Sequence, residues 1–511
     1  MSFRDRSERF ALEITVFVCG ALVMIFEING SRILAPYLGT STYIWTSLIG
    51  VILAALSLGY WLGGRLADRQ PHLKVLATVI FLAGGLVSIS TFGKDVVLGS
   101  IAAMPIALEF KSIFGALLLF APASIAFGFV LPFAVKIRLQ TLAESGKTVG
   151  SLYALSTVGS ILGTFLAGFV LIPFVGSLRT LYVIAITLFA LSLLLAPFAV
   201  THRSIACIVF FVFAVFANES LALYGWQTRR LIDVDTEYAR LAIFDAKDPH
   251  TGKAIRVIAD DPYFIQSAIF LDSDDLVFEY NRFFHLAPYF KPDMQRSLMI
   301  GGAGYSFPRD FLRTYPNAMI DVVEIDPGMT KIAREQFRLI DEPRLKIIHT
   351  DARLYLNELP NGLYDTIFMD AFGTLFSVPY QLTTVEAVRQ MHRSLKNDGV
   401  IVANIGGALA GEGSKFFQAE LATFRAVFDD VRIYKVVAER NDSELQNLIL
   451  VGIKGNRQYE TVEKNSMASR LLDHEYRVQL GPLMPVLTDD LAPVEYYNSI
   501  AQNFRKPANG N

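Results

Sequence analysis

The run Ser297–Asp326, SLMIGGAGYSFPRDFLRTYPNAMIDVVEID, decides the fold of the C-terminal half of this chain. Its first four residues form a short, mostly apolar run that leads into glycines. A helix-like segment, 307–315, then separates them from a second strand-like run, Ile320–Ile325, which ends in acids. A strand, a glycine turn, a helix and a second strand in this order are typical of nucleoside-binding α/β units. The run therefore predicts a Rossmann-like domain.

The glycine turn and the acids beyond it indicate a ligand. The glycines that let the backbone come close to a bound molecule are Gly301, Gly302 and Gly304. The start of the following helix offers free N–H groups. Glu324 lies about twenty residues further on, at the carboxyl end of the second strand, where such folds place an acid that accepts hydrogen bonds from ribose hydroxyls. Asp326 follows it. The turn predicts a nucleoside site, and a glycine turn that holds no ligand is the alternative.

The spacing of the glycines narrows the choice of nucleoside. A dinucleotide fingerprint reads G-x-G-x-x-G, but the position of its third glycine is taken here by Phe307. Phenylalanine is too bulky for the close contact between helix and strand that the third glycine allows. The pattern therefore argues against NAD and leaves adenosyl ligands such as S-adenosylmethionine.

Composition divides the chain into two halves. At 511 residues it is too long for one ordinary domain. Residues 11–225 are rich in apolar side chains and poor in charges, whereas residues 226–511 carry most of the charge. With 46 basic and 48 acidic residues the charge is near balance, so no nucleic-acid partner is expected. Both cysteines, Cys19 and Cys207, lie in apolar runs, which offers neither a disulfide framework nor a cysteine metal site. No metal is expected.

The first half, 1–225, predicts a helical membrane domain in contact with lipid. Stretches of about 20 apolar residues, enough to cross a bilayer, occur near 11–31, 43–64, 73–93, 112–135, 149–172, 178–200 and 204–224. This gives about seven spans, and the short apolar stretch 96–110 leaves an eighth crossing or a re-entrant piece open. Glycine pairs four residues apart, Gly59 with Gly63 and Gly159 with Gly163, favour close packing of helices in lipid.

The distribution of basic residues bears on the orientation of the helices. They cluster in the N-terminal tail, in the loops 65–74 and 136–147, and near Arg203, which places all of these on the inside. Seven spans would then leave the second half outside. S-adenosyl ligands are expected in the cytoplasm. For this reason we expect a multi-pass protein of the bacterial inner membrane whose soluble half lies in the cytoplasm.

The second half shows strands that alternate with helices. Residues 226–290 predict a small antiparallel β region followed by a helix, and residues 291–511 predict a mostly parallel, doubly wound sheet closed by two late strands near 430–437 and 447–453. In such sheets, ligands bind at the carboxyl ends of the strands. The predicted architecture is thus a membrane α-helical bundle followed by an α/β Rossmann-like domain.

Three acids follow predicted strands and should meet at one crevice: Glu324, Asp351 and Asp370. Asp351, with Ala352 beginning the next helix, is placed to accept a hydrogen bond from an adenine amino group, or else to cap that helix. Asp370 ends a buried strand and opens a loop, where it is placed to take a proton from an amine or to hold the amine in line for attack. An acid that only caps the loop is the alternative.

Several motifs together resemble a known family. IGGAGYSFPR, VVEID, HTDAR, YDTIFMDAF and LKNDGVIVANI, preceded by Gln266-Ser267, are similar to the spermidine synthase family of aminopropyltransferases. GGRLADR at 63–69 and the segment 150–163 resemble helices of major facilitator transporters. The order of the two halves resembles a bacterial subgroup in which such an enzyme is fused to transporter-like helices.

The resemblance implies an activity and a set of roles. Decarboxylated S-adenosylmethionine would donate an aminopropyl group to a diamine such as putrescine, giving spermidine and methylthioadenosine. Glu324 would hold the ribose, Asp351 the adenine and Gln266 the region near the amine of the donor, while Asp370 would deprotonate the attacking amine. The family's glycine loop reads Gly-Gly-Gly-Asp-Gly, so its acid is missing here, and fewer acids attract a polycationic acceptor less strongly.

Two other functions stay open at the level of sequence. The same sheet serves other S-adenosylmethionine-dependent enzymes, either methyltransferases or enzymes that cleave this ligand. A transporter-like membrane protein whose soluble half senses an adenosyl ligand or a polyamine is the non-enzymatic alternative. The sequence is also compatible with a homo-oligomer.

Overall fold

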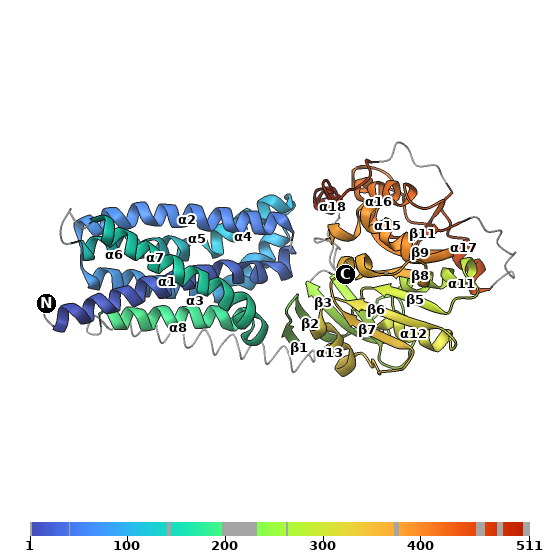
Figure 1. The fold of residues 1–511 in the computed structure, drawn as a ribbon, viewed down its shortest axis with the longest axis horizontal. Coiled ribbons are helices and arrows are strands. Elements are labelled where there is room, and N and C mark those ends of the chain that lie inside the picture. Colours follow the sequence, from blue (N-terminus) through green and yellow to red (C-terminus); the bar gives the residue numbers. More distant parts are fainter. Residues whose placement is uncertain are drawn as a thin grey trace. The chain divides into compact units, whose positions relative to one another are not determined.

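The computed structural model describes residues 3–39, 41–139, 145–196, 232–261, 264–371, 378–455, 466–477 and 484–503. The chain divides into two units, which we call the helical unit (Met1–Thr228 with Asp233–Arg240) and the α/β unit (Arg229–Ile232 with Leu241–Asn511). Figure 1 shows the helices of the first and the sheets of the second.

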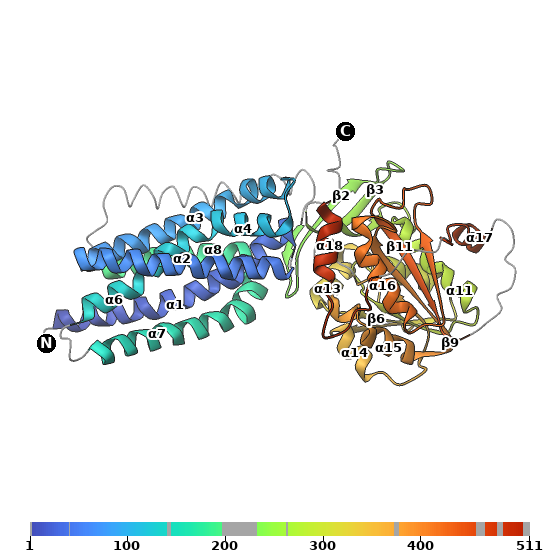
Figure 2. The ribbon, with the colours of Figure 1, turned by 90° about the horizontal axis from the view of Figure 1, so that it is seen from above.

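The helical unit is a bundle of long helices that run alongside one another (Figures 1 and 2). Its elements are α1 (Phe3–Leu38), α2 (Thr42–Arg69), α3 (Leu73–Ala102), α4 (Leu108–Leu119), α5 (Ala121–Gly128), α6 (Val130–Arg138), α7 (Ser145–Leu166), the π-helix η2 (Ala167–Val175) and α8 (Ser177–Leu195). In the described part of the chain, six helical stretches are long and apolar enough to cross a membrane. The predicted span 204–224 lies outside the described residues.

One predicted span differs from the structure. The stretch 112–135 is not one helix but parts of α4, α5 and α6, and the stretch long enough to cross a membrane is Ala121–Arg138. Pro122 stands in the first turn of α5, where its missing N–H costs nothing, and this position is typical of a helix that starts anew. Apolar periodicity alone does not reveal such a break.

Glycines bring the helices of the bundle into close contact, which confirms the packing predicted for the glycine pairs. A Cβ added to Gly159 would lie 2.0 Å from the carbonyl oxygen of Phe17, and one added to Gly59 would lie 2.2 Å from that of Ile125. Any side chain at these positions would therefore force α7 away from α1, or α2 away from α5.

The segment Asp233–Arg240, hereafter the 233–240 segment, belongs to the helical unit. Asp235 accepts hydrogen bonds at 2.9 Å from both the backbone N–H and the hydroxyl of Ser177, the first residue of α8. Glu237 accepts a hydrogen bond on its carbonyl oxygen from Arg32 of α1. At the other end of the bundle, Arg138 pairs with Glu13 near the start of α1. The segment is thus held at the end of the bundle opposite the basic loops.

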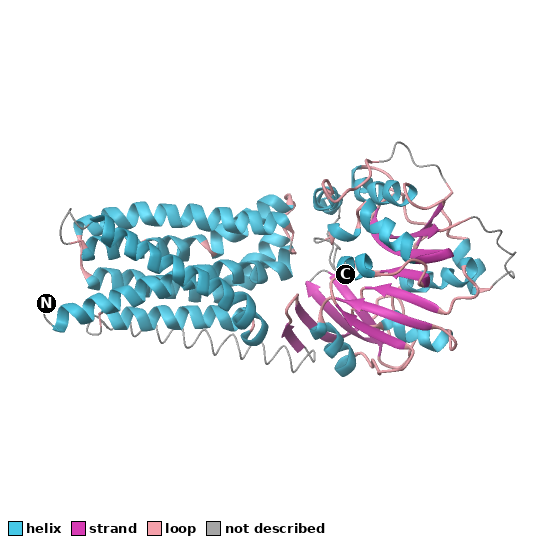
Figure 3. Cartoon of the chain, in the orientation of Figure 1, coloured by secondary structure: helices cyan, strands magenta, loops and turns pink. Residues whose placement is uncertain are grey.

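The α/β unit contains two sheets, drawn as magenta arrows in Figure 3. The strands of the smaller, antiparallel sheet include β2 (Arg240–Lys247), β3 (Ala254–Asp261) and β4 (Phe264–Phe270), with β3 in the middle, and a short strand β1 (Ile232–Asp235) precedes them. Short helical turns follow, namely α10 (Glu279–Arg282), η3 (Phe283–Leu286) and α11 (Ala287–Phe290). The single helix predicted before the glycine turn is therefore broken into three pieces.

The larger sheet has seven strands in the order β10-β11-β9-β8-β5-β6-β7. Its strands are β5 (Arg296–Ile300), β6 (Met319–Glu324), β7 (Leu345–His349), β8 (Tyr364–Met369), β9 (Leu395–Gly407), β10 (Asp430–Lys435) and β11 (Gln446–Ile453). The first five of these in the sequence pair in parallel, and β10 and β11 are antiparallel. The sheet is therefore mixed, with the mostly parallel centre that the sequence predicts.

The helices of this unit connect the strands and cover the sheet. They are α12 (Ser306–Thr314), α13 (Pro327–Gln336), α14 (Ala352–Glu358), η4 (Tyr380–Leu382), α15 (Val385–Ser394), η5 (Glu412–Ser414), α16 (Lys415–Arg425), α17 (Met467–Leu472) and α18 (Val494–Asn503).

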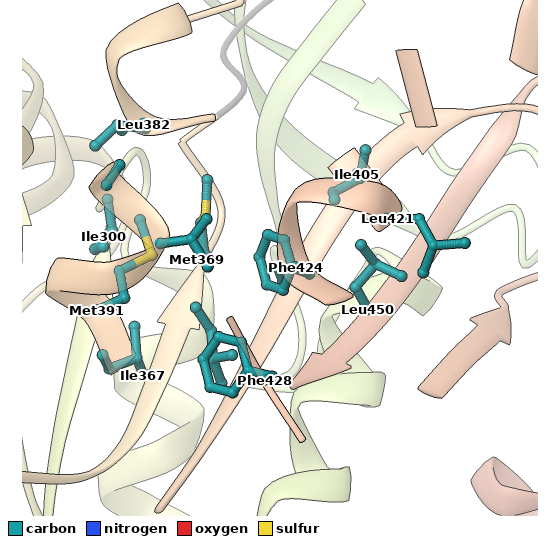
Figure 4. Packing of buried hydrophobic residues seen from close by; sticks show 14 of the residues in the cluster. Ile300, Ile367, Met369, Leu382, Met391, Ile405, Leu421, Phe424, Phe428 and Leu450 are labelled. Carbon is teal, nitrogen blue, oxygen red and sulfur yellow. The ribbon is translucent and has the colours of Figure 1, made fainter. Parts of the chain in front are cut away.

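Both faces of the sheet are buried, as the alternation along β8 shows. Ile367 and Met369 belong to a hydrophobic core shared with α15 and α16, in which Met391 and Phe424 lie (Figure 4). Phe368, between them, points the other way and packs on the aromatic residues of η3 and α12, with a ring distance of 4.8 Å to Phe307. Because successive side chains of a strand face opposite sides, the last three residues of β8, 367–369, are apolar on both faces of the sheet.

Candidate functional site

The strand order creates a crevice between the ends of β5 and β8. The chain leaves β5 toward β6 on one side, whereas β8 lies on the other side of β5, and this change of direction is where open α/β sheets bind ligands. The backbone N–H of Asp370 donates to the carbonyl of Ile300 at 3.0 Å, and that of Gly301 donates to Val323 at 2.9 Å. The ends of three neighbouring strands are therefore tied together below the glycine turn.

A glycine is required at position 301, where the glycine loop after β5 meets the loop after β8. Its φ of +92° is a conformation that favours glycine, and a Cβ added there would lie 2.3 Å from the carbonyl oxygen of Asp370. The structure thus brings Gly301 and Asp370, which the sequence assigned to ligand binding and to proton transfer, into direct contact.

Glu324 organises the glycine loop. One of its carboxylate oxygens accepts hydrogen bonds from the N–H groups of Gly302 and Ala303, at 2.9 and 3.0 Å, and the other accepts one from Asp326 at 2.9 Å. Burial raises the pKa of Glu324, and the three backbone donors act in the opposite direction. The carboxylate that the sequence assigned to ribose is already bonded to the loop, and its remaining lone pairs are what it offers to a ligand.

Asp326 and Asp351 stand at the N-termini of helices. Asp326 caps α13 by accepting from the N–H of Gly328 at 2.8 Å. One oxygen of Asp351 accepts from Arg353 and Leu354, at 2.7 and 3.1 Å, and so caps α14, which begins at Ala352. The capping role that the sequence left open for Asp351 is present, and it engages one carboxylate oxygen.

Asp370 has two partners that the sequence analysis missed. The side-chain amide of Asn404 donates to its carboxylate at 3.0 Å, and the hydroxyl of Tyr280 also bonds to it. Desolvation raises the pKa of Asp370 to about 6, while both donors lower it. Asn404 is 7% exposed, and its amide oxygen has no hydrogen-bond partner.

These two partners carried a weak sequence signal. Asn404 follows the apolar run of its strand near the carboxyl end, where the rule that found the acids could also have found it. Tyr280 lies on the turn α10, far from Asp370 in the sequence. Only the folded structure shows that it reaches this carboxylate.

Gln266 and Ser267 reach the glycine loop from the small sheet. The pairing of β3 with β4 steps from Ile258–Ser267 to Ala259–Ile265, which leaves Gln266 as the extra residue of a bulge. Its amide oxygen is buried without a hydrogen-bond partner. Ser267 lies against Gly304, because a Cβ added there would be 2.4 Å from the serine hydroxyl. Ser267 thus fills the space that an acid at position 304 would need.

The C-terminal tail is held beside the start of α14. Asp489 pairs with Arg353 at 2.8 Å and accepts a hydrogen bond from Thr384 at 2.6 Å. Arg353 lies two residues beyond Asp351, so these contacts fix the tail close to the turn that carries Asp351. Within the described ranges, no group of three or more histidine, cysteine, aspartate or glutamate side chains is arranged to hold a metal ion.

Comparison with known proteins identifies the α/β unit. Residues 278–444 match the spermine/spermidine synthase domain. A polyamine aminopropyltransferase of Vibrio vulnificus is 29% identical over 230 residues, which cover 44% of this chain and 74% of the relative. Polyamine aminopropyltransferase 1 of Streptomyces coelicolor is 22% identical over 431 residues, which cover 78% of this chain and 76% of the relative.

A solved structure is also similar. The crystal structure of a probable spermidine synthase from Corynebacterium glutamicum is 27% identical and has a TM-score of 0.40, with 48% of this chain and 86% of that chain covered. The α/β unit has the Rossmann-like fold of transferases that use adenosylmethionine-type ligands. Residues 278–444 match this family of enzymes, so the α/β unit contains a domain of the spermine/spermidine synthase type.

Proposed function

We propose that this protein is a membrane-bound aminopropyltransferase. It transfers the aminopropyl group of decarboxylated S-adenosylmethionine to a diamine such as putrescine, giving spermidine and methylthioadenosine. The observation that carries the proposal is the placement of Asp370, a carboxylate with a raised pKa of about 6, directly beside the glycine loop at the switch point of the sheet.

The reaction is a direct displacement. The nitrogen of the amine forms a bond to the carbon next to the sulfonium, the carbon–sulfur bond breaks, and its electron pair stays on sulfur as a neutral thioether. The proton of the amine passes to the carboxylate of Asp370. A carboxylate with a pKa of about 6 is ionised at neutral pH and is a stronger base than an ordinary aspartate. Holding both reactants in line supplies the rest of the acceleration.

The donor would lie across the ends of β5, β6 and β7. The glycine loop, with Gly301, Gly302 and Gly304, approaches its sulfonium side, Glu324 accepts from the ribose, and Asp351 with Ala352 faces the adenine. Asp326 fixes the helix behind the loop. The buried amide oxygen of Gln266, which has no hydrogen-bond partner, suits the ammonium group of the aminopropyl chain.

The acceptor side is less acidic than the family pattern. Ser267 excludes an acid from position 304, and Arg282 adds a positive charge to α10, the turn that carries Tyr280, which its pairing with Glu279 at 3.4 Å partly offsets. The attraction for a polycation is therefore weaker. We expect an acceptor of low charge, such as a diamine, to be preferred over a longer polyamine.

Two observations support attachment to a membrane. Six stretches of the described helices are long and apolar enough to cross a bilayer. The match with the Streptomyces coelicolor relative spans 431 residues, more than the α/β unit holds, so it continues into the helical unit. We place the protein in the bacterial plasma membrane as a multi-pass protein in contact with lipid.

The first test measures binding and turnover of the full-length protein. Calorimetry with decarboxylated S-adenosylmethionine, intact S-adenosylmethionine and methylthioadenosine should show a preference for the decarboxylated donor. Mass spectrometry with a panel of diamines should show a gain of one aminopropyl unit. Preference for the intact donor without such a product would instead support a methyltransferase or a cleavage enzyme.

Asp370→Asn tests the catalytic role. The variant keeps the shape of the side chain but cannot accept the proton, so turnover should fall by about 100-fold or more, while the Kd of methylthioadenosine stays near that of the wild type. The matched control is Asp341→Asn, which removes an exposed carboxylate paired with Arg334 and should change neither quantity. Unchanged turnover in Asp370→Asn would remove the assigned role, and binding without any product would favour a sensor.

A further inference from the structure

Tyr305 occupies an unusual backbone conformation in the glycine loop. Its φ of +54° and ψ of +28° lie in the left-handed region, where residues with a Cβ are disfavoured. Ala303, two residues earlier, also has a positive φ, of +44°. In the described part of the chain only one other non-glycine residue, Arg338, shares this property. A tyrosine persists in such a conformation only where its surroundings hold it there.

The ring of Tyr305 supports the loop from below. The side chain is completely buried. A Cβ added to Gly302 would lie 2.7 Å from the ring carbon that carries the hydroxyl, so the ring lies against the backbone of Gly302. The N–H of Gly302 donates to Glu324. Gly302 is therefore fixed by the carboxylate at its nitrogen and by the aromatic ring at its Cα.

The hydroxyl of Tyr305 extends this support to a second element of the site. It forms a hydrogen bond of 2.7 Å with the hydroxyl of Thr330 on α13, which is also completely buried. Thr330 in turn bonds to the imidazole Nε2 of His349 at 2.9 Å. His349 is the last residue of β7, two positions before Asp351. A continuous chain of polar groups thus joins the glycine loop to the turn that carries Asp351.

We propose that Tyr305 is a positioning residue for the adenosyl ligand. Through Thr330 and His349 it holds the glycine loop and the Asp351 turn in the relative placement that binds the donor. This inference rests on the proposed adenosyl site. It explains why the loop keeps a tyrosine in a strained conformation, since a preformed loop does not have to be ordered when the ligand binds.

The test compares ligand affinity with stability in the full-length protein. Tyr305→Phe keeps the ring against Gly302 but removes the hydroxyl. We expect the Kd of methylthioadenosine and the KM for the donor to rise about fivefold, the effect of one lost hydrogen bond, with kcat changed less than twofold. Thr330→Val removes the partner of the Tyr305 hydroxyl together with the bond to His349, so it should weaken binding at least as much, whereas Thr330→Ser keeps a hydroxyl and should keep tight binding.

Tyr364→Phe is the matched control. Tyr364 is another buried tyrosine of the α/β unit, and its hydroxyl donates to Asp321 at 2.7 Å. It begins β8, whereas the site lies at the opposite end of that strand. The control should lower the Tm without changing the Kd of methylthioadenosine. A purely structural Tyr305 would behave in the same way, and that result would overturn the inference.

The outcomes also separate this inference from the proposed function. Wild-type protein that binds methylthioadenosine but makes no aminopropyl product removes the proposed reaction, while a weaker Kd in Tyr305→Phe and Thr330→Val would still support the positioning role. Wild-type protein that does not bind methylthioadenosine overturns both. Normal catalysis with wild-type affinity in both variants overturns the positioning role alone.

Discussion

Asp370 illustrates how a single side chain is tuned by its surroundings. Desolvation raises its pKa to about 6, and the donors Asn404 and Tyr280 hold the value from rising further. The carboxylate must be ionised to accept the proton of the amine. At the residue scale, the proposed role of Asp370 as the base therefore makes turnover depend on the protonation state of this group.

The pH dependence of turnover follows from this environment. Below the pKa, Asp370 is protonated and cannot act as a base, so we expect kcat/KM to increase as the pH rises through about 6 and then to level off. In Tyr280→Phe the carboxylate loses a donor that stabilises its charged form, which should move this inflection to a higher pH. A pH profile of both proteins measures the shift.

The wild-type profile is its own reference, and Tyr364→Phe serves as the control for removal of a tyrosine hydroxyl elsewhere. An inflection that stays in place in Tyr280→Phe, or one near the ordinary aspartate value in the wild type, would contradict the assignment of the base.

At this scale the sequence reveals the acids better than their partners. Asp370 and Glu324 follow strands of clear apolar character, and the ends of parallel strands meet at one edge. The hydroxyl of Tyr280 reaches Asp370 only through the fold. The positive φ of Tyr305 could not be predicted either. The sequence pattern indicates a glycine turn but does not show which of its residues takes the left-handed conformation.

Gly301 determines how two elements, the glycine loop and the loop after β8, fit together. Gly301→Ala would add a Cβ 2.3 Å from the carbonyl oxygen of Asp370 and would also force a side chain into a positive φ. We expect a loss of stability clearly larger than the roughly 1 kcal/mol that a positive φ alone costs, together with loss of turnover. Denaturant unfolding and a turnover assay measure the two effects.

Gly362→Ala separates the two causes. Gly362 also has a positive φ, of +66°, but a Cβ added there meets no atom within 4 Å. The control should lose only the stability that a side chain at a positive φ costs, and it should keep its activity. If Gly301→Ala lost no more stability than Gly362→Ala, the close contact between the two loops would be of no consequence.

Most elements of the α/β unit follow from periodicity and turn residues, and their order follows from the alternation of strands and helices. The exceptions have physical reasons. The helix predicted before the glycine turn is three short pieces, and the last of them, α11, carries Pro288 in its first turn, where a continuous helix would need a backbone N–H donor. In the helical unit, the predicted span 112–135 falls on three helices, because hydropathy shows the length of an apolar stretch but not whether one continuous helix forms it.

At the scale of the whole molecule, composition alone separates the helical unit from the α/β unit. Composition does not show on which side of the proposed membrane the chain continues. The 233–240 segment is bound to the N-terminus of α8, opposite the end where Lys136 and Arg138 pair with Asp68 and Glu13. If the basic end faces the cytoplasm, this segment faces the other side, contrary to the expectation from ligand chemistry.

Labelling of single cysteines decides between the two expectations. In a protein with Cys19 and Cys207 replaced by alanine, a cysteine at Tyr238, which is 47% exposed, should react with a membrane-impermeant maleimide added to intact cells. A cysteine at His72, an exposed residue of the loop between α2 and α3, should react only after permeabilisation. Protection of position 238 in intact cells would restore the cytoplasmic placement.

The hydrogen bonds between Asp235 and Ser177 therefore bear on which substrates can reach the α/β unit. Residue 241 follows Asp235 by only six positions, so the α/β unit starts in the compartment where Asp235 is anchored, and the proposed reaction could use only the amines and donors present there. An enzyme outside the cytoplasm would depend on the export of a metabolite that is made inside. The growth conditions that provide this metabolite would then limit the rate of the reaction more than the chemistry at Asp370.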